Sequence, residues 1–134
     1  MKRILILLLA LTFVFSLVSC GDISDEEAKG QADELVKCVS ENRFEDAKAL
    51  LHPDRPIDIA AVFERAEQTY GVDFQSGIRV SHYDLSGSES EKEVDGTEYE
   101  VDLEIVVSGR ALELSLSIVR NDNGFGIYSI EIDD

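Results

Sequence analysis

The sequence is poor in the residue types that metal, disulfide and nucleic-acid chemistry require. It has two histidines, two cysteines and no tryptophan, and its 12 basic residues are outnumbered by 28 acidic ones. His52 and His82 are too far apart in the chain for an HxH or HExxH metal motif. A net charge of −16 argues against nucleic acid as a partner, because phosphate binding needs lysine and arginine.

Catalytic and cofactor motifs are also missing. The chain contains no GxSxG nucleophile motif and no glycine-rich phosphate loop, so we predict no catalytic residue, no cofactor and no metal. An acidic stretch after the first predicted strand lacks the spacing of a calcium loop and indicates a solvated hairpin tip, formed by Glu89, Glu91, Glu93 and Asp95. The sequence therefore favours a non-enzymatic protein and leaves an enzyme as the alternative.

One long apolar run stands at the start of the chain. Lys2 and Arg3 precede residues 4–18, which have the length of an export signal and are short for a membrane span. An ordinary secretory signal or an uncleaved anchor would also explain this run. Residues 17–21, LVSCG, resemble the lipobox of bacterial lipoproteins, in which the cysteine, here Cys20, becomes the mature N-terminus.

The lipobox resemblance implies how the chain is processed and where it resides. Residues 1–19 would be a signal peptide, and Cys20 would carry a diacylglyceryl thioether and an acylated amino group, such as a palmitoyl amide. Two or more acyl chains anchor a protein stably. Residues 20–23 would be the lipidated cysteine and a short tether, and residues 24–134 a domain on the extracytoplasmic side of the cell membrane or envelope.

The mature chain is one acidic domain by size. Removal of residues 1–19 takes away Lys2 and Arg3 and no acid, which changes the net charge from −16 to −18. Such a charge opposes adsorption to anionic lipid. Solubility and repulsion from the cell surface explain it, and attraction of a cationic partner or of a divalent metal ion is the functional alternative. Cys38 remains as a single cysteine on a helical apolar stripe, which indicates core packing rather than a nucleophile or a disulfide.

Helical periodicity precedes strand periodicity along the domain. Three helices are predicted, from Ser24 as N-cap with Glu27 in a capping box, within residues 41–54, and from near Pro56 to Gly71. Four strands follow, within residues 77–85, 97–107, 110–120 and 125–132, with a loop at 86–96 and hairpin turns at 108–109 and 121–124. This order predicts an α+β fold, with the N-terminal helices packed on one face of a four-stranded antiparallel sheet.

The element order resembles the NTF2-like (cystatin-like) superfamily, in its branch of small bacterial lipoproteins. The resemblance is carried by ENRFEDAKALLHPD at 41–54 and NGFGIYSIEI at 123–132. Many members have a tryptophan where Phe125 or Gly126 stands, and this chain departs from that pattern. The resemblance implies a curved sheet that forms a cone with the helices, either open as a pocket or filled by side chains.

Few polar residues are predicted on the inner face of such a cone. His82 shares an apparent strand face with Ile78 and Val80, and Tyr70, Tyr99 and Tyr128 are the other candidates for a pocket lining. A histidine there could act as an acid or base, although hydrogen-bonded core positions are the commoner role. His52, beside Pro53, is expected at an exposed helix end.

Two functions follow from these expectations. The first is a membrane-anchored envelope lipoprotein whose domain binds an unknown protein or small-molecule partner without catalysis. The second is a ligand carrier or enzyme that uses the cone cavity around His82 and the tyrosines. A homodimer through an exposed sheet edge is a further expectation, since the superfamily often dimerises.

Overall fold

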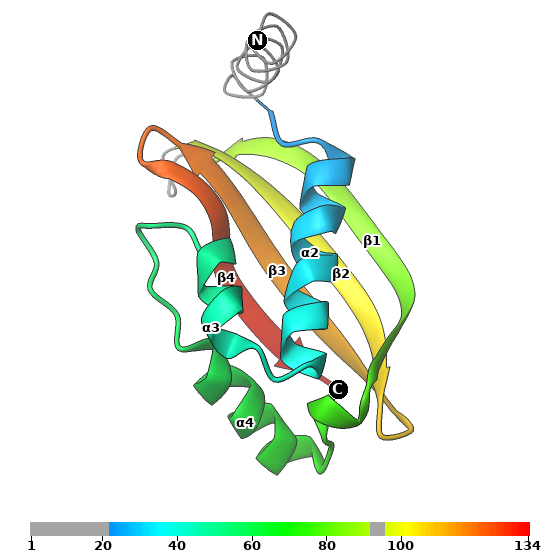
Figure 1. Cartoon of the computed structure of the whole chain (residues 1–134). Helices are drawn as coiled ribbons and strands as arrows, with labels where there is room; N and C mark the ends of the chain where they lie inside the picture. Colours follow the sequence, from blue (N-terminus) through cyan, green and yellow to red (C-terminus); the bar gives the residue numbers. More distant parts are fainter. Residues whose placement is uncertain (1–21, 92–95) are drawn as a thin grey trace, which may run out of the picture.

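Three helices cover one side of a four-stranded antiparallel sheet in the computed structural model, which describes residues 22–91 and 96–134 (Figure 1). The strand order is β1-β2-β3-β4, so each strand pairs with its neighbour in sequence. The elements are α2 (Asp25–Ser40), α3 (Phe44–Ala47), η1 (Lys48–Leu50), α4 (Ile59–Tyr70), η2 (Phe74–Ser76), β1 (Ile78–Glu91), β2 (Gly96–Val107), β3 (Arg110–Asn121) and β4 (Gly124–Asp133). The predicted α+β class, with helices on a curved sheet, is confirmed.

Helix α2 begins at the predicted capping box. The Glu27 amide donates to Ser24 Oγ at 3.1 Å, and the Ser24 amide donates to Glu27 Oε2 at 3.3 Å. These two bonds satisfy amides that a helix start leaves without partners. The apolar stripe of α2 is buried against the sheet and comprises Ala28, Ala32, Leu35, Val36, Cys38 and Val39.

The second and third helices differ from their predicted bounds. Helix α3 is a single turn that tightens into η1, because Leu51 leaves the helix and pairs with Ile127 of β4 in an isolated parallel bridge. Helix α4 begins at Ile59 rather than near Pro56, with Asp58 as its N-cap. It ends as predicted at Gly71, whose φ of 66° places it in the left-handed region that glycine adopts freely.

Strands β2 and β3 follow the predicted alternation, the register of β1 and of β4 shifts within each strand, and one predicted loop is shorter than expected. Strand β1 continues to Glu91 and pairs with β2 through that residue, so the loop predicted at 86–96 is wrong for residues 86–91. The turns at Ser108–Gly109 and 121–124 are confirmed as hairpins. Strand β1 is longer than predicted because its pairing with β2 uses backbone hydrogen bonds, which polar residues do not prevent.

Several expectations fall on parts of the chain that the structure does not describe. Cys20, the signal segment 1–19 and the acidic side chains of Glu89, Glu91, Glu93 and Asp95 lie outside the described residues. Residues 22 and 23 are described, and Ile23 is buried at 3% exposure, so the predicted tether of residues 20–23 is partly built into the domain. None of the helices in residues 22–91 and 96–134 has the length and apolar character needed to span a bilayer.

Candidate functional site

Side chains fill the layer between the helices and the sheet. Tyr99, Leu103 and Ile105 of β2 have no exposed surface, and Phe63 of α4 is 1% exposed. Phe63 also packs edge-on against Phe74, with ring centroids 5.0 Å apart. A cavity large enough for water would give the side chains around it some accessible surface. The described centre of the cone is therefore closed to a small molecule.

His82 does not lie on the inner face, so the prediction that it shares a face with Val80 is wrong. The pairing of β1 with β2 shifts between Val80 and His82, which leaves Ser81 as a bulged residue. Ser81 Oγ donates to the Glu104 carbonyl at 3.1 Å. A bulge of one residue reverses which side chains face the core. His82 is therefore exposed opposite Glu104, and Tyr83 takes the inward position opposite Leu103.

The three predicted tyrosines lie at separate places and do not converge. Tyr99 is fully buried, and its hydroxyl donates to Asp25 Oδ1 in the first turn of α2 at 2.5 Å. The Tyr70 hydroxyl donates to the Ile132 carbonyl at 3.2 Å. The Tyr128 ring lies beneath the Arg55 guanidinium, 4.7 Å from its carbon. Each tyrosine therefore joins two elements, and together they form no pocket.

His52 is buried rather than exposed, which corrects the expectation of a helix end. It is 1% exposed, and its Nδ1 accepts a hydrogen bond from the Asp54 amide at 3.0 Å. That bond assigns the proton to Nε2, which lies 3.0 Å from Asn121 Oδ1 and 3.2 Å from the Gly124 carbonyl. A neutral His52 thus fastens the segment after η1 to the β3–β4 hairpin.

Cys38 is a core residue, as predicted. It is a free thiol with 1% exposure, and its Sγ lies 3.9 Å from Glu34 Oε1. Burial raises the pKa of the Cys38 thiol, and the nearby Arg43 only partly opposes that effect. A neutral, enclosed thiol is a poor nucleophile, so this cysteine offers no catalytic chemistry.

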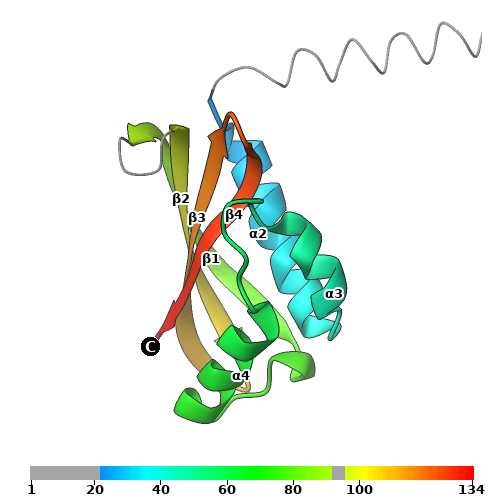
Figure 2. The same ribbon diagram turned by 90° about the vertical axis from the view of Figure 1, so that its left-hand side faces the viewer.

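The opposite face of the sheet is open, because the described helices all lie on the other side (Figure 2). The register places acids of neighbouring strands directly opposite one another on this face. Glu113 of β3 pairs with Glu104 on one side and with Asp133 on the other. We call this surface the acidic sheet face, formed by His82, Asp84, Glu98, Glu100, Asp102, Glu104, Glu113, Ser115, Ser117, Ser129, Glu131 and Asp133.

Two shallow depressions lie on the acidic sheet face. One has a volume of about 290 Å³ and lies beside His82, with Asp84, Asp102, Glu104 and Glu113 among its lining residues. The other has a volume of about 420 Å³ and is lined by acids and by three serines, Ser115, Ser117 and Ser129. Ser117 Oγ donates to Glu98 Oε1 at 2.8 Å. The surface is thus rich in hydrogen-bond acceptors that carry negative charge.

The sequence alone did not identify the acidic residues of β3 and β4 on this face as candidate site residues. They are Glu113, Glu131 and Asp133. The Ser108–Gly109 turn could have identified Glu113, because a two-residue turn fixes the register and sets Glu104 opposite Glu113. Glu131 and Asp133 were harder to place, because the pairing of β4 shifts between Ser117 and Ile118. Opposite like charges destabilise a sheet, so folding alone does not favour this arrangement.

Neither metal-binding geometry among the described residues nor a match to a known protein points to a function for this face. Among the described residues, no group of three histidine, cysteine, aspartate or glutamate side chains is placed to hold a metal ion. Comparison with protein-family models, with curated proteins and with solved structures finds no match to this chain.

Proposed function

We propose that this protein is a lipid-anchored bacterial envelope lipoprotein whose NTF2-like domain is a non-enzymatic binding module, and that it binds a basic polypeptide through the acidic sheet face. The anchor would be Cys20, on the extracytoplasmic side of the membrane. The observation that carries the proposal is the contrast between the two faces of the sheet. The centre of the inner face is filled by packed side chains, with a depression of about 480 Å³ at its edge between α4 and β4, and the outer face is open and acidic.

The alternative of a ligand carrier or enzyme in the cone has less support. Its four predicted residues occupy four different environments, and His82 lies on the outer face. A binding site for a small molecule needs a concave cavity with converging polar groups. The described centre of the interior offers neither, whereas the outer face offers a broad surface that is mostly acidic, with Arg79 of β1 at one end.

The chemistry of a basic polypeptide fits this surface in charge and in spacing. Glu98, Glu100, Asp102 and Glu104 alternate along β2, so successive carboxylates lie about 7 Å apart along the strand. An extended peptide with lysine or arginine at every second residue has the same repeat. Such a peptide would also reduce the repulsion between Glu113 and its two acidic neighbours.

Neutralising the centre of the acidic sheet face tests the proposed binding. We expect a fluorescent decalysine peptide to bind the Glu104→Gln, Glu113→Gln and Asp133→Asn triple variant about tenfold more weakly than the parent. This change corresponds to a loss of about 1.4 kcal/mol. Fluorescence anisotropy at low and at physiological ionic strength measures the affinity, and salt should weaken binding of the parent more.

A second triple variant with the same net charge is the control. Glu26, Glu45 and Glu64 are exposed on the helical side, and their replacement by glutamine removes three charges far from the acidic sheet face. We expect this variant to bind decalysine within about twofold of the parent. Equal weakening by the two variants would mean that total charge, not this surface, attracts the peptide.

Replacement of Cys20 tests the proposed anchor. We expect Cys20→Ala to abolish recovery of the protein in the membrane fraction and to leave its folding unchanged, because the lipid would be its main hydrophobic attachment. Carbonate-washed membranes and circular dichroism of the released protein measure the two effects. A Cys20→Ala protein that stays in the washed membranes would disprove the lipid anchor.

The expected homodimer through a sheet edge stays a prediction.

A further inference from the structure

We infer that the domain stands upright on the membrane, with the start of α2 and the β3–β4 hairpin toward the lipid and the acidic sheet face directed sideways. This orientation rests on the lipid anchor proposed above. It identifies the membrane-facing end of the molecule and implies a partner beside the protein in the plane of the membrane.

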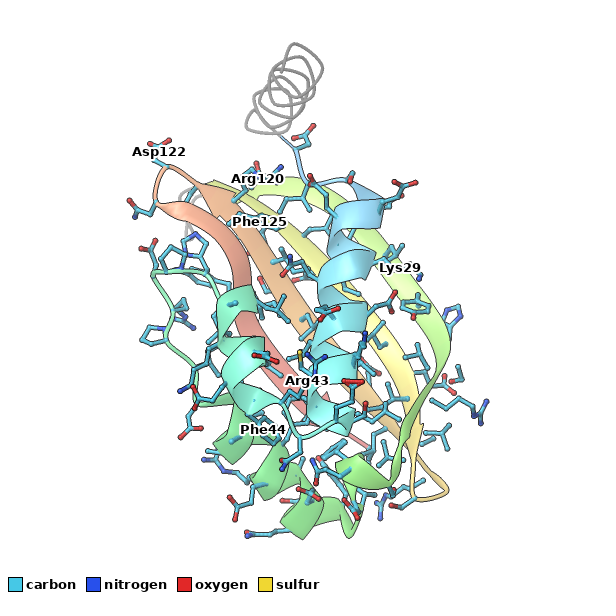
Figure 3. The ribbon with its side chains drawn as sticks, viewed as in Figure 1. Lys29, Arg43, Phe44, Arg120, Asp122 and Phe125 are labelled. Atoms are coloured by element: carbon cyan, nitrogen blue, oxygen red, sulfur yellow. The ribbon has the colours of Figure 1, made fainter. Side chains whose placement is uncertain are left out.

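The first observation is that the start of the described chain is held firmly to the sheet. Arg120 Nη1 donates to the Asp22 carbonyl at 3.1 Å, and Arg120 Nη2 lies 3.3 Å from Glu27 Oε2. The same guanidinium lies 4.5 Å from the ring centre of Phe125 (Figure 3). The Arg120 side chain is only 17% exposed. Bonds of a charged group in such a partly enclosed position are stronger than those at an open surface.

Ile23 completes the attachment of this segment. Its side chain is 3% exposed within the hydrophobic core, between the bound carbonyl of Asp22 and the capping box of Ser24. The segment from Asp22 onward is therefore part of the domain and cannot act as a flexible linker. Only Gly21 separates it from Cys20. Two peptide units span about 8 Å at most, so the acyl chains would enter the bilayer next to this end of the domain.

The second observation is the arrangement of the elements along the domain. Figure 1 shows the start of α2 and the β3–β4 hairpin at one end, and α4 with the β2–β3 hairpin at the other. Strand β3 has 12 residues and runs between the two hairpins, a distance of about 40 Å. Arg110 Nη1 donates to the Tyr70 carbonyl at 3.1 Å, which fixes the last turn of α4 at the far end.

The charge of the domain opposes a tilted position. A short tether alone does not fix the angle between a domain and the membrane, so a second effect must select the upright position. The mature chain would have a net charge of −18, and its exposed acids lie on the sheet face, on the helices and at the lipid-facing end, where Asp22 and Asp122 stand. An anionic bilayer repels such surfaces over about a Debye length. The tether holds the end with Asp25 and Asp122 near the lipid in every position, and a tilt would bring the acids of the sheet face or of the helices near the lipid as well.

Quenching by spin-labelled lipid headgroups tests the orientation in the full, lipidated chain. Asp122→Cys, in the β3–β4 hairpin, and Gln68→Cys, on α4, each place a fluorophore at an exposed position of one end. Cys38 is buried and should not react, which labelling of the parent protein checks. In vesicles of phosphatidylcholine and phosphatidylglycerol, we expect quenching at position 122 to be several-fold stronger than at position 68.

A linker insertion provides the matched control. Sixteen glycine and serine residues between Gly21 and Asp22 add a mean span of about 22 Å without touching the domain. We expect this insertion to remove most of the difference between positions 122 and 68. Equal quenching at the two positions without the insertion would overturn the upright orientation. Failure of the parent protein to float with the vesicles would instead disprove the lipid anchor, and with it this inference.

Discussion

Gly126→Ala is expected to destabilise the domain by about 3 kcal/mol, the upper part of the usual range for overpacking. A Cβ atom at position 126 would lie 2.5 Å from the His52 amide nitrogen and 2.7 Å from the Leu50 carbonyl oxygen. These are backbone atoms, and the His52 amide is bound to the Ile127 carbonyl at 2.9 Å. The segment after η1 would have to separate from β4 to make room for the added methyl group. Urea unfolding measures the resulting loss of unfolding free energy.

Gly30→Ala is the matched control for this prediction. A Cβ atom at position 30, on the exposed side of α2, meets no other atom within 4 Å. Alanine favours a helix interior over glycine by about 1 kcal/mol, so this variant should be more stable than the parent. The same glycine-to-alanine change is thus expected to lower the free energy of unfolding at position 126 and to raise it at position 30. A Gly126→Ala protein as stable as the parent would show that the contact of residues 50–52 with β4 is dispensable.

His52→Ala is expected to cost about 3 kcal/mol of unfolding free energy, through a cavity and the loss of hydrogen bonds in a buried place. The substitution would leave the Asp54 amide, Asn121 Oδ1 and the Gly124 carbonyl without their imidazole partner. It would also remove the edge-on contact with Tyr128, whose ring centroid lies 5.6 Å away. Thermal and urea unfolding of the purified domain measure the loss.

His82→Ala is the corresponding control on the acidic sheet face. His82 is exposed, and replacement of an exposed side chain usually changes stability by less than about 0.5 kcal/mol. The two histidines should therefore differ by a wide margin in their effect on folding. A similar cost for both would contradict the assignment of His52 to the interior and of His82 to the surface.

Local signals in the sequence were sufficient for the helix and strand pattern. The capping box of Ser24 and Glu27, the left-handed Gly71 and the alternation from Tyr99 to Val107 act through neighbours in the chain. Such features have short-range causes, namely hydrogen bonding at helix ends and the period of a strand. The sequence therefore predicted the α+β class and the inner residues of β2 correctly.

The candidate site depended on features that are not local. The bulge at Ser81 moved His82 to the outer face, and the bridge between Leu51 and Ile127 drew His52 into the interior. A strand period assigns side chains to faces only while the register is continuous, and one extra residue reverses the assignment. The sequence pattern contained no sign of either event, so both histidines were predicted on the wrong side.

The sequence by itself determined the class of fold and the strong negative charge, and the lipid anchor at Cys20 is a proposal from the sequence alone. These properties depend on composition and on short motifs. Only the tertiary structure decided that the centre of the layer between helices and sheet is filled, that acids from four strands gather on one open face, and that Arg120 holds Asp22 against the sheet. The physical reason is that packing and strand register join residues far apart in the chain, and no local preference encodes those contacts.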